Sequence, residues 1–380
     1  MGIFDYGPVE NCSKEICMSP SRTLDPESPE ILEMWIITFL VWAVLSIAAF
    51  LLVKFSRGNF RSWVISTPYY SGMIGIGTLW FSVFIGGFVI PDGQFGAWTH
   101  SLSQYTTVSV LVYYQPIRTL IPIGFSIANF GALVALAEGW RRWEKDDSRD
   151  LSQYKLISLF TIVALSVLMI PILDVVTTPS YLNALGAWGL TFLLIVIGLS
   201  ASYSLFEAYR NGSGLGRLPS LFLLPMWGTL VIAGSFWVEA SLSFARFFDR
   251  PIHLDASYTS FLFAALTPIF GSLTLHSIAM EKDSDTLFEK RLLMISGLII
   301  LLAVSYVICY EMKVYNSFFN GNYNESLIGF HEHILLSMEF FWLSYFGKVF
   351  IHYQRQSGDH PSCLLYTSPS PRDGLLSSDH

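Results

Sequence analysis

Nine long apolar stretches, each followed by a short polar break, make up most of the first 355 residues of this chain. A run of about 20 apolar residues is what an α-helix needs to cross the hydrocarbon core of a bilayer. Only 13% of the residues are charged, whereas a soluble domain carries about 25%. The pattern therefore predicts an all-α fold, a polytopic transmembrane helix bundle, and not a soluble protein with a large core.

The bounds of the nine predicted spans follow from the apolar runs and are 31–54, 64–90, 110–140, 156–176, 182–209, 219–247, 258–280, 292–315 and 332–353. The segment 91–117 is the least regular. Residues 91–93 read Pro-Asp-Gly, which is turn chemistry, and Tyr113 and Tyr114 suit a membrane interface. An arrangement of seven or eight spans, with one stretch re-entrant or interfacial, is the alternative.

The distribution of lysine and arginine predicts the orientation, because cytoplasmic loops retain these residues. With the N-terminus outside, fifteen of them fall in cytoplasmic breaks and six outside, the six being Lys14, Arg22, Arg118, Arg246, Arg250 and Lys313. An inverted chain would reverse this bias. We therefore expect the N-terminus outside and the C-terminus in the cytoplasm, in the plasma membrane or a membrane of the secretory pathway.

The domain organisation follows from these spans. We expect an extracellular polar tail at 1–30, a transmembrane helical domain at 31–355 and a cytoplasmic tail at 356–362. Residues 363–380 resemble the translated read-through of a sequencing adapter, and the alternative is a native Ser/Pro-rich disordered tail. The adapter interpretation leaves open a cytosolic domain after Ser362.

The polar regions outside the membrane carry signs of secretory processing. Asn11 and Asn324 begin glycosylation sequons that fall outside, whereas the sequon at Asn211 falls inside and should be silent. Cys12 and Cys17 would form a disulfide in an extracellular tail, and two free thiols are the alternative.

Ionisable residues within apolar runs are costly, so each needs a partner or a function. Glu239 and Arg246 are two helical turns apart and share a face with Ser235 and Ser243. This stripe is either a solute- or ion-contacting surface or an interhelical seam of ion pairs and hydrogen bonds. Arg246 could also extend to the outer interface and leave the stripe.

Three more ionisable residues lie with these in the outer half of the predicted bundle. Asp174 follows Pro171 and is either a cation or proton site or a solvated residue near the end of its span. Glu339 is the deepest acid, and it is either protonated or ionised beside a basic residue. Together with Arg118, they predict a polar vestibule that opens to the outside.

Two further patterns have structural interpretations. His331-Glu332-His333 lacks the spacing of a helical zinc motif, so we expect a solvated helix start. Small residues recur in the second span at Ser71, Gly72, Gly75, Gly77 and 86–87, and close helix packing explains them.

Net charge and sequence motifs restrict the functional classes that this chain can belong to. A net charge of −7 argues against a nucleic-acid partner, and no acid/base, metal or cofactor motif indicates an enzyme. We expect a carrier or channel for a small solute or ion. The alternatives are a receptor-like or scaffold protein with a truncated cytosolic domain and a structural subunit of a membrane complex.

Overall fold

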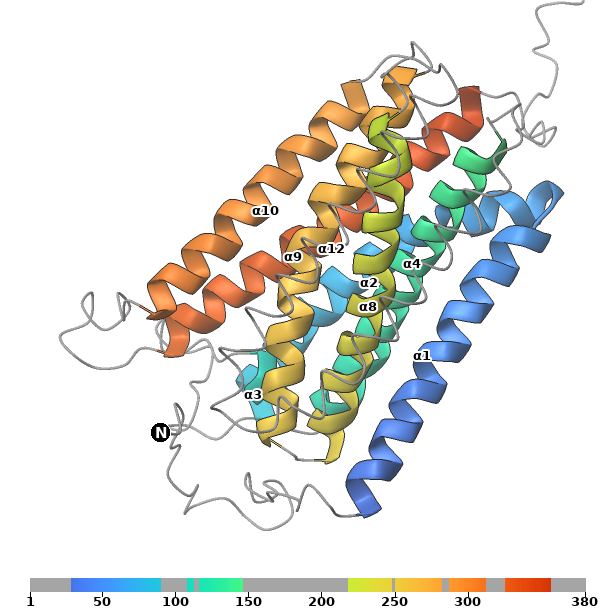
Figure 1. Ribbon diagram of the computed structural model, residues 1–380. Helices are drawn as coiled ribbons and strands as arrows, with labels where there is room; N and C mark the ends of the chain where they lie inside the picture. The colour runs from blue at the N-terminus through green and yellow to red at the C-terminus, as the bar shows by residue number, and fades with distance from the viewer. Residues whose placement is uncertain are drawn as a thin grey trace, which may run out of the picture.

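The structure is a computed structural model that describes residues 29–89, 108–112, 116–145, 218–247, 250–281, 287–311 and 325–356. Within these ranges every regular element is a helix (Figure 1). The elements are α1 (Pro29–Phe55), α2 (Gly58–Val89), α3 (Val108–Leu111), α4 (Ile117–Lys145), α8 (Leu218–Phe247), α9 (Arg250–Glu281), α10 (Leu287–Glu311) and α12 (Glu325–Gln356). The predicted helical fold is confirmed for this part of the chain. The spans predicted at 156–176 and 182–209 lie outside it.

Four of the described helices are long and apolar enough to cross a membrane. The apolar segments are Glu33–Phe55 of α1, Gly58–Gly86 of α2, Ile117–Arg142 of α4 and Gly329–Gln354 of α12. A shorter apolar segment, Phe263–His276, lies within α9. The length and composition of these helices support the interpretation that this is an integral membrane protein.

The outer faces of the bundle are apolar, as contact with lipid requires. On α1, the exposed residues Leu40, Val44, Ile47 and Leu51 recur at helical spacing along one face, and Val44 is 64% exposed. A similar exposed row on α10 comprises Met294, Leu298 and Leu301. A soluble monomer rarely exposes apolar surfaces of this extent, so these faces are suited to the hydrocarbon of a bilayer.

Six of the long helices that the structure describes form a closed ring of neighbours. Going round the ring, α2 packs against α12, α12 against α10, α10 against α9, α9 against α8, α8 against α4, and α4 again against α2. Helix α1 lies outside the ring, against α4 and α8, at the edge of the bundle in Figure 1. The indole Nε1 of Trp42 fixes α1 by donating to the Ser235 hydroxyl at 2.9 Å and to the Ile232 carbonyl at 3.0 Å.

The third predicted span differs from the structure at its beginning. It was expected at 110–140, but α3 ends at Leu111 and α4 begins only at Ile117. Pro116 provides the reason, because proline has no N–H to donate and is favoured where a helix starts. Its carbonyl accepts hydrogen bonds from the backbone of Thr119 at 3.0 Å and Leu120 at 3.3 Å, which starts α4.

Glycines bring α2 and α12 into close backbone contact. A Cβ atom added at Gly72 would lie within 3.0 Å of the Phe340 carbonyl, and one added at Gly347 would lie within 3.0 Å of the Tyr69 backbone. A Cβ at Gly75 would meet the Phe340 ring at 2.8 Å. Helices approach this closely only where the side chain is a hydrogen atom. The predicted packing role of Gly72 and Gly75 is confirmed.

The contact between α2 and α4 follows the same principle. Cβ atoms at Gly124 and Gly131 would collide with the side chains of Thr78 and Ser71, respectively. Gly77 is different, because no atom of the described part of the chain lies within 4 Å of a Cβ added there. The packing role predicted for Gly77 is therefore wrong: this position lies on the exposed face of α2.

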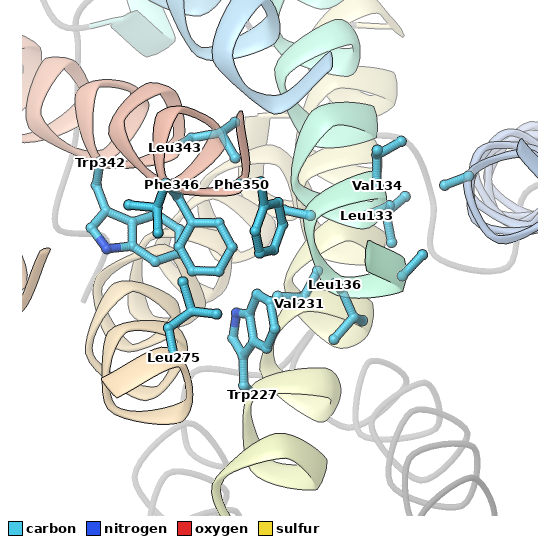
Figure 2. Close-up of a cluster of buried hydrophobic side chains, with 14 of the residues drawn as sticks. Leu133, Val134, Leu136, Trp227, Val231, Leu275, Trp342, Leu343, Phe346 and Phe350 are labelled. Carbon is cyan, nitrogen blue, oxygen red and sulfur yellow. The ribbon is translucent and has the colours of Figure 1, made fainter. Parts of the chain in front are cut away.

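A large apolar core fills one end of the ring. Figure 2 shows its aromatic centre, where Trp342, Phe346 and Phe350 of α12 meet Trp227 of α8 and the leucines of α4. Trp227, Phe346 and Phe350 are each no more than 1% exposed. The rings of Trp342 and Phe346 lie 4.8 Å apart, and those of Phe346 and Phe350 lie 4.9 Å apart. We refer to these four aromatic residues as the aromatic core.

An ion cluster stabilises the same end of the bundle. Glu138 of α4 is 1% exposed and pairs with Arg61 of α2 and, at 2.8 Å, with Arg142 one turn further along α4. The Arg142 guanidinium also lies 5.0 Å from the Phe350 ring centroid and 5.2 Å from that of Tyr353. The cluster joins α2, α4 and α12, and its arginines belong to the group that the charge distribution assigns to the cytoplasmic side.

We expect Gly347→Ala to destabilise the bundle by about 1–3 kcal/mol, because the added methyl group has to push α2 and α12 apart. The measurement is equilibrium unfolding in mixed detergent micelles, followed by tryptophan fluorescence.

Gly77→Ala is the matched control, since its methyl group meets open space. It should leave stability unchanged or raise it by up to about 1 kcal/mol, through the better helix propensity of alanine. Equal stability of the two variants would contradict the proposed tight contact.

Candidate ligand-binding pocket

A cavity of about 170 Å³ lies inside the ring of helices, and we call it the interhelical pocket. Its walls come from α3, α4, α8, α9 and α12. Most of the lining is apolar and includes the aromatic residues Phe125, Phe261, Phe263, Phe340 and Trp342. Its polar lining side chains, apart from the Trp342 indole, are Asn129, Ser235, Ser241, Ser257, Ser260, Thr267, Glu332 and Glu339.

The pocket and the ion cluster lie at opposite ends of the bundle. Helices α4, α9 and α12 contribute lining residues from their first halves and middles, whereas α8, which runs the other way, contributes from its middle and second half. Val231, Trp342 and Leu343 belong both to the lining and to the apolar core of Figure 2. The core therefore forms the floor of the pocket.

Glu339 is the group in the pocket whose burial most needs an explanation. Its side chain lines the pocket from the middle of α12 and is 8% exposed. Its Oε1 atom is buried and has no hydrogen-bond partner among the described residues. A buried polar atom without a partner costs about 1–3 kcal/mol. A carboxyl group with such an atom, on a residue that lines a cavity, is suited to contact a molecule bound there.

Glu332 lies two helical turns before Glu339, on the same face of α12. It also lines the pocket but is held by the protein, because its Oε2 atom accepts a hydrogen bond from the Val108 backbone N–H at 3.3 Å. The contact attaches α3 to α12. Of the two carboxyl groups in the pocket, Glu332 is thus the one with a structural partner.

The solvated helix start expected at His331-Glu332-His333 is wrong. Helix α12 begins earlier, at Glu325, so these residues lie in its second and third turns inside the bundle. Glu332 and His333 are 3% and 0% exposed, and the Nδ1 atom of His333 donates a hydrogen bond to the Gly329 carbonyl. His331 contacts the Leu302 carbonyl at 3.0 Å and the Ser305 hydroxyl at 3.1 Å, which links α12 to α10.

Glu239 lies in a hydrogen-bonded seam between α8 and α4. Its Oε1 atom accepts from the amide of Asn129 at 2.8 Å, and its Oε2 atom accepts from the hydroxyl of Ser126 at 3.0 Å. The same Asn129 amide also donates to the Ser235 carbonyl at 3.1 Å. Both carboxylate oxygens are occupied by the protein, and Glu239 is not among the residues that line the pocket.

A second polar contact crosses the pocket wall between α8 and α9. The hydroxyls of Ser241 and Ser257 lie 2.7 Å apart, both are buried, and both line the pocket. Ser260, one turn further along α9, donates to the Ser257 carbonyl of its own helix. The serine hydroxyls of this part of the wall are therefore hydrogen-bonded to other residues of the wall.

The other predicted site residues lie away from the pocket or outside the described residues. Arg118 is half-buried in the first turn of α4 and does not line the pocket. Arg246 lies in the last turn of α8, and only its backbone position is described. Outside the described residues fall Asp174, the sequon residues Asn11 and Asn324, and the cysteine pair Cys12 and Cys17.

Sequence reasoning missed the contribution of Glu332, Asn129, Ser241 and Ser257 to this region. Glu332 could have been found from its spacing, because seven residues place it on the same face as Glu339. Nothing in the sequence pairs Ser241 with Ser257, or Asn129 with Glu239, since each pair joins two different helices.

Known proteins supply no further guide to this pocket. No family model, curated protein or solved structure significantly matches the chain.

Glu239→Leu should destabilise the protein by about 1–3 kcal/mol, because the Asn129 and Ser126 donors lose their buried acceptor. Glu239→Gln retains an acceptor oxygen of the same shape and should cost less. Equilibrium unfolding in mixed micelles distinguishes the two. If Glu239→Leu is as stable as the parent protein, the seam does not hold α4 against α8.

Proposed function

We propose that this protein is a membrane carrier that binds a small solute in the interhelical pocket and moves it across the bilayer. One observation carries the proposal. Glu339 lines a cavity within the apolar bundle, and its buried Oε1 atom has no hydrogen-bond partner in the described part of the chain. A group of this kind is rare inside a membrane bundle and marks solute or ion pathways.

The membrane arrangement belongs to the same proposal. We infer nine spans with the N-terminus outside, from the nine apolar stretches and the charge distribution. The pocket would then face the outside, and the ion cluster would face the cytoplasm. Asn11 and Asn324 would be glycosylated, with Cys12 and Cys17 available to form a disulfide, in the plasma membrane or the secretory pathway.

The packed core favours a carrier over an open channel. The pocket ends on Val231, Trp342 and Leu343, and the rings of Phe346 and Phe350 pack immediately beyond them. A channel needs a continuous polar path, whereas a carrier needs a binding site that is closed on one side at a time. The packed floor supports a carrier whose binding site is closed toward the end of the ion cluster.

The remaining candidate residues have supporting roles in this proposal. Arg118 and Arg246 lie near the end of the bundle where the pocket is, at the start of α4 and the end of α8. They would surround the outer entrance together with Asp174. Glu239 would keep α4 and α8 together behind the pocket wall.

Cysteine accessibility tests the carrier. In a background in which all four cysteines of the chain are replaced by serine, Ser260→Cys places a thiol in the pocket lining. A membrane-impermeant methanethiosulfonate reagent is added to right-side-out and to inside-out vesicles. A carrier alternates its access, so we expect labelling of Ser260→Cys from both faces.

Ser296→Cys is the matched control, because Ser296 is buried between α10 and α9, where its hydroxyl lies 2.8 Å from that of Ser272, away from the pocket. It should stay unlabelled in both preparations. Labelling of Ser260→Cys from one face only would contradict a carrier and favour a receptor-like protein. If Ser260→Cys is labelled from neither face, the result would contradict the carrier and favour a structural subunit.

A further inference from the structure

We propose that the interhelical pocket selects a small organic cation, an amine with an apolar body, and that Glu339 recognises its positive charge. The inference rests on the proposed function in one respect, namely that the pocket is the solute site. It adds the chemical class of the solute and the residue that selects it.

The titratable side chains of the pocket lining are all acidic among the described residues. Glu332 and Glu339 are the titratable side chains among the described residues that line the pocket; α3, α4, α8 and α9 contribute none, and no lysine, arginine or histidine lines it. Charges interact strongly in apolar surroundings. An anionic solute would therefore be repelled, whereas a cation would supply the positive charge that the lining lacks.

The two carboxyl groups do not contribute equally. Glu332 is engaged by the Val108 backbone N–H at 3.3 Å, whereas the Oε1 atom of Glu339 is buried and has no partner among the residues that the structure describes. An ammonium group has three N–H donors, and one of them would satisfy this oxygen. Charge-assisted hydrogen bonds of this type are about twice as strong as neutral ones.

The rest of the lining fits an apolar body of limited size. The rings of Phe125 and Phe340 meet edge to face at 5.1 Å, and Phe261 lines the pocket from α9. Aromatic faces attract cations as well as apolar groups. The volume of about 170 Å³ is below the roughly 300–1,000 Å³ of pockets for drug-sized ligands. Both features favour a small arylalkyl or alkyl amine.

A bare metal ion fits the pocket less well than an organic cation. Calcium takes six to eight oxygen ligands, and magnesium also requires a nearly complete oxygen shell. In the described ranges no three His, Cys, Asp or Glu side chains are grouped to hold a metal. The apolar walls would also leave much of such an ion without ligands.

The test is binding of three probes of similar shape and different charge to the full-length protein in lipid nanodiscs. Radiolabelled phenethylamine is the cation, 2-phenylethanol the neutral probe and 3-phenylpropionate the anion. We expect phenethylamine to bind most tightly. Glu339→Gln should weaken phenethylamine binding about tenfold to hundredfold and leave 2-phenylethanol binding nearly unchanged.

Glu289→Gln is the control for removing a buried carboxylate elsewhere. Glu289 is 0% exposed and accepts a hydrogen bond from the Tyr353 hydroxyl, outside the pocket lining. This variant should keep the full preference for the amine.

Several outcomes would overturn the inference. These are failure of the parent protein to bind phenethylamine, equal or tighter binding of the alcohol or the acid, and an unchanged amine affinity in Glu339→Gln. If Glu339→Gln does not fold, the order of the three probe affinities in the parent protein is the test of the inference. If Ser260→Cys is labelled from both faces but the amine is not preferred, this inference fails and the carrier stands.

Discussion

The close contact of α2 with α12 and α4 is the constraint on which the rest of the bundle depends. Gly72 and Gly347 let the backbones of α2 and α12 approach within a distance that excludes any larger side chain. Lipid offers apolar surfaces no gain on burial, so helices in a membrane associate through packing and hydrogen bonds. The Ser344 hydroxyl, which donates to the Tyr69 carbonyl at 3.0 Å, adds such a bond at the same contact.

This contact positions α12, and α12 in turn links the two ends of the molecule. Its second half supplies Phe346 and Phe350 to the aromatic core and places Phe350 beside Arg142. Its first half presents Glu332 and Glu339 to the pocket. At one end, charges pair with each other around Glu138. In the pocket, the Oε1 atom of Glu339 has no partner among the described residues. The two ends of the bundle therefore differ in how their buried charged groups are paired.

Much of the helical framework was predictable from the apolar runs, because length and hydrophobicity are local properties. The helix boundaries were less predictable than the helices themselves. Pro116 delays the start of α4, and the start of α12 at Glu325 places Glu332 and His333 inside the bundle instead of in solvent. The glycines of α2 show the same limit: Gly72 and Gly77 look alike in the sequence, but only Gly72 faces another helix.

The sequence by itself determined that this is a helical membrane protein with costly acids at Glu239 and Glu339, because both conclusions depend only on what lies along one chain segment. Which acid has partners was decided by the tertiary structure. Glu239 meets Asn129 and Ser126 across a helix contact, and Glu339 meets a cavity. The physical reason is that hydrogen bonding and burial depend on neighbours from other helices, and helix rotation within the ring sets those neighbours.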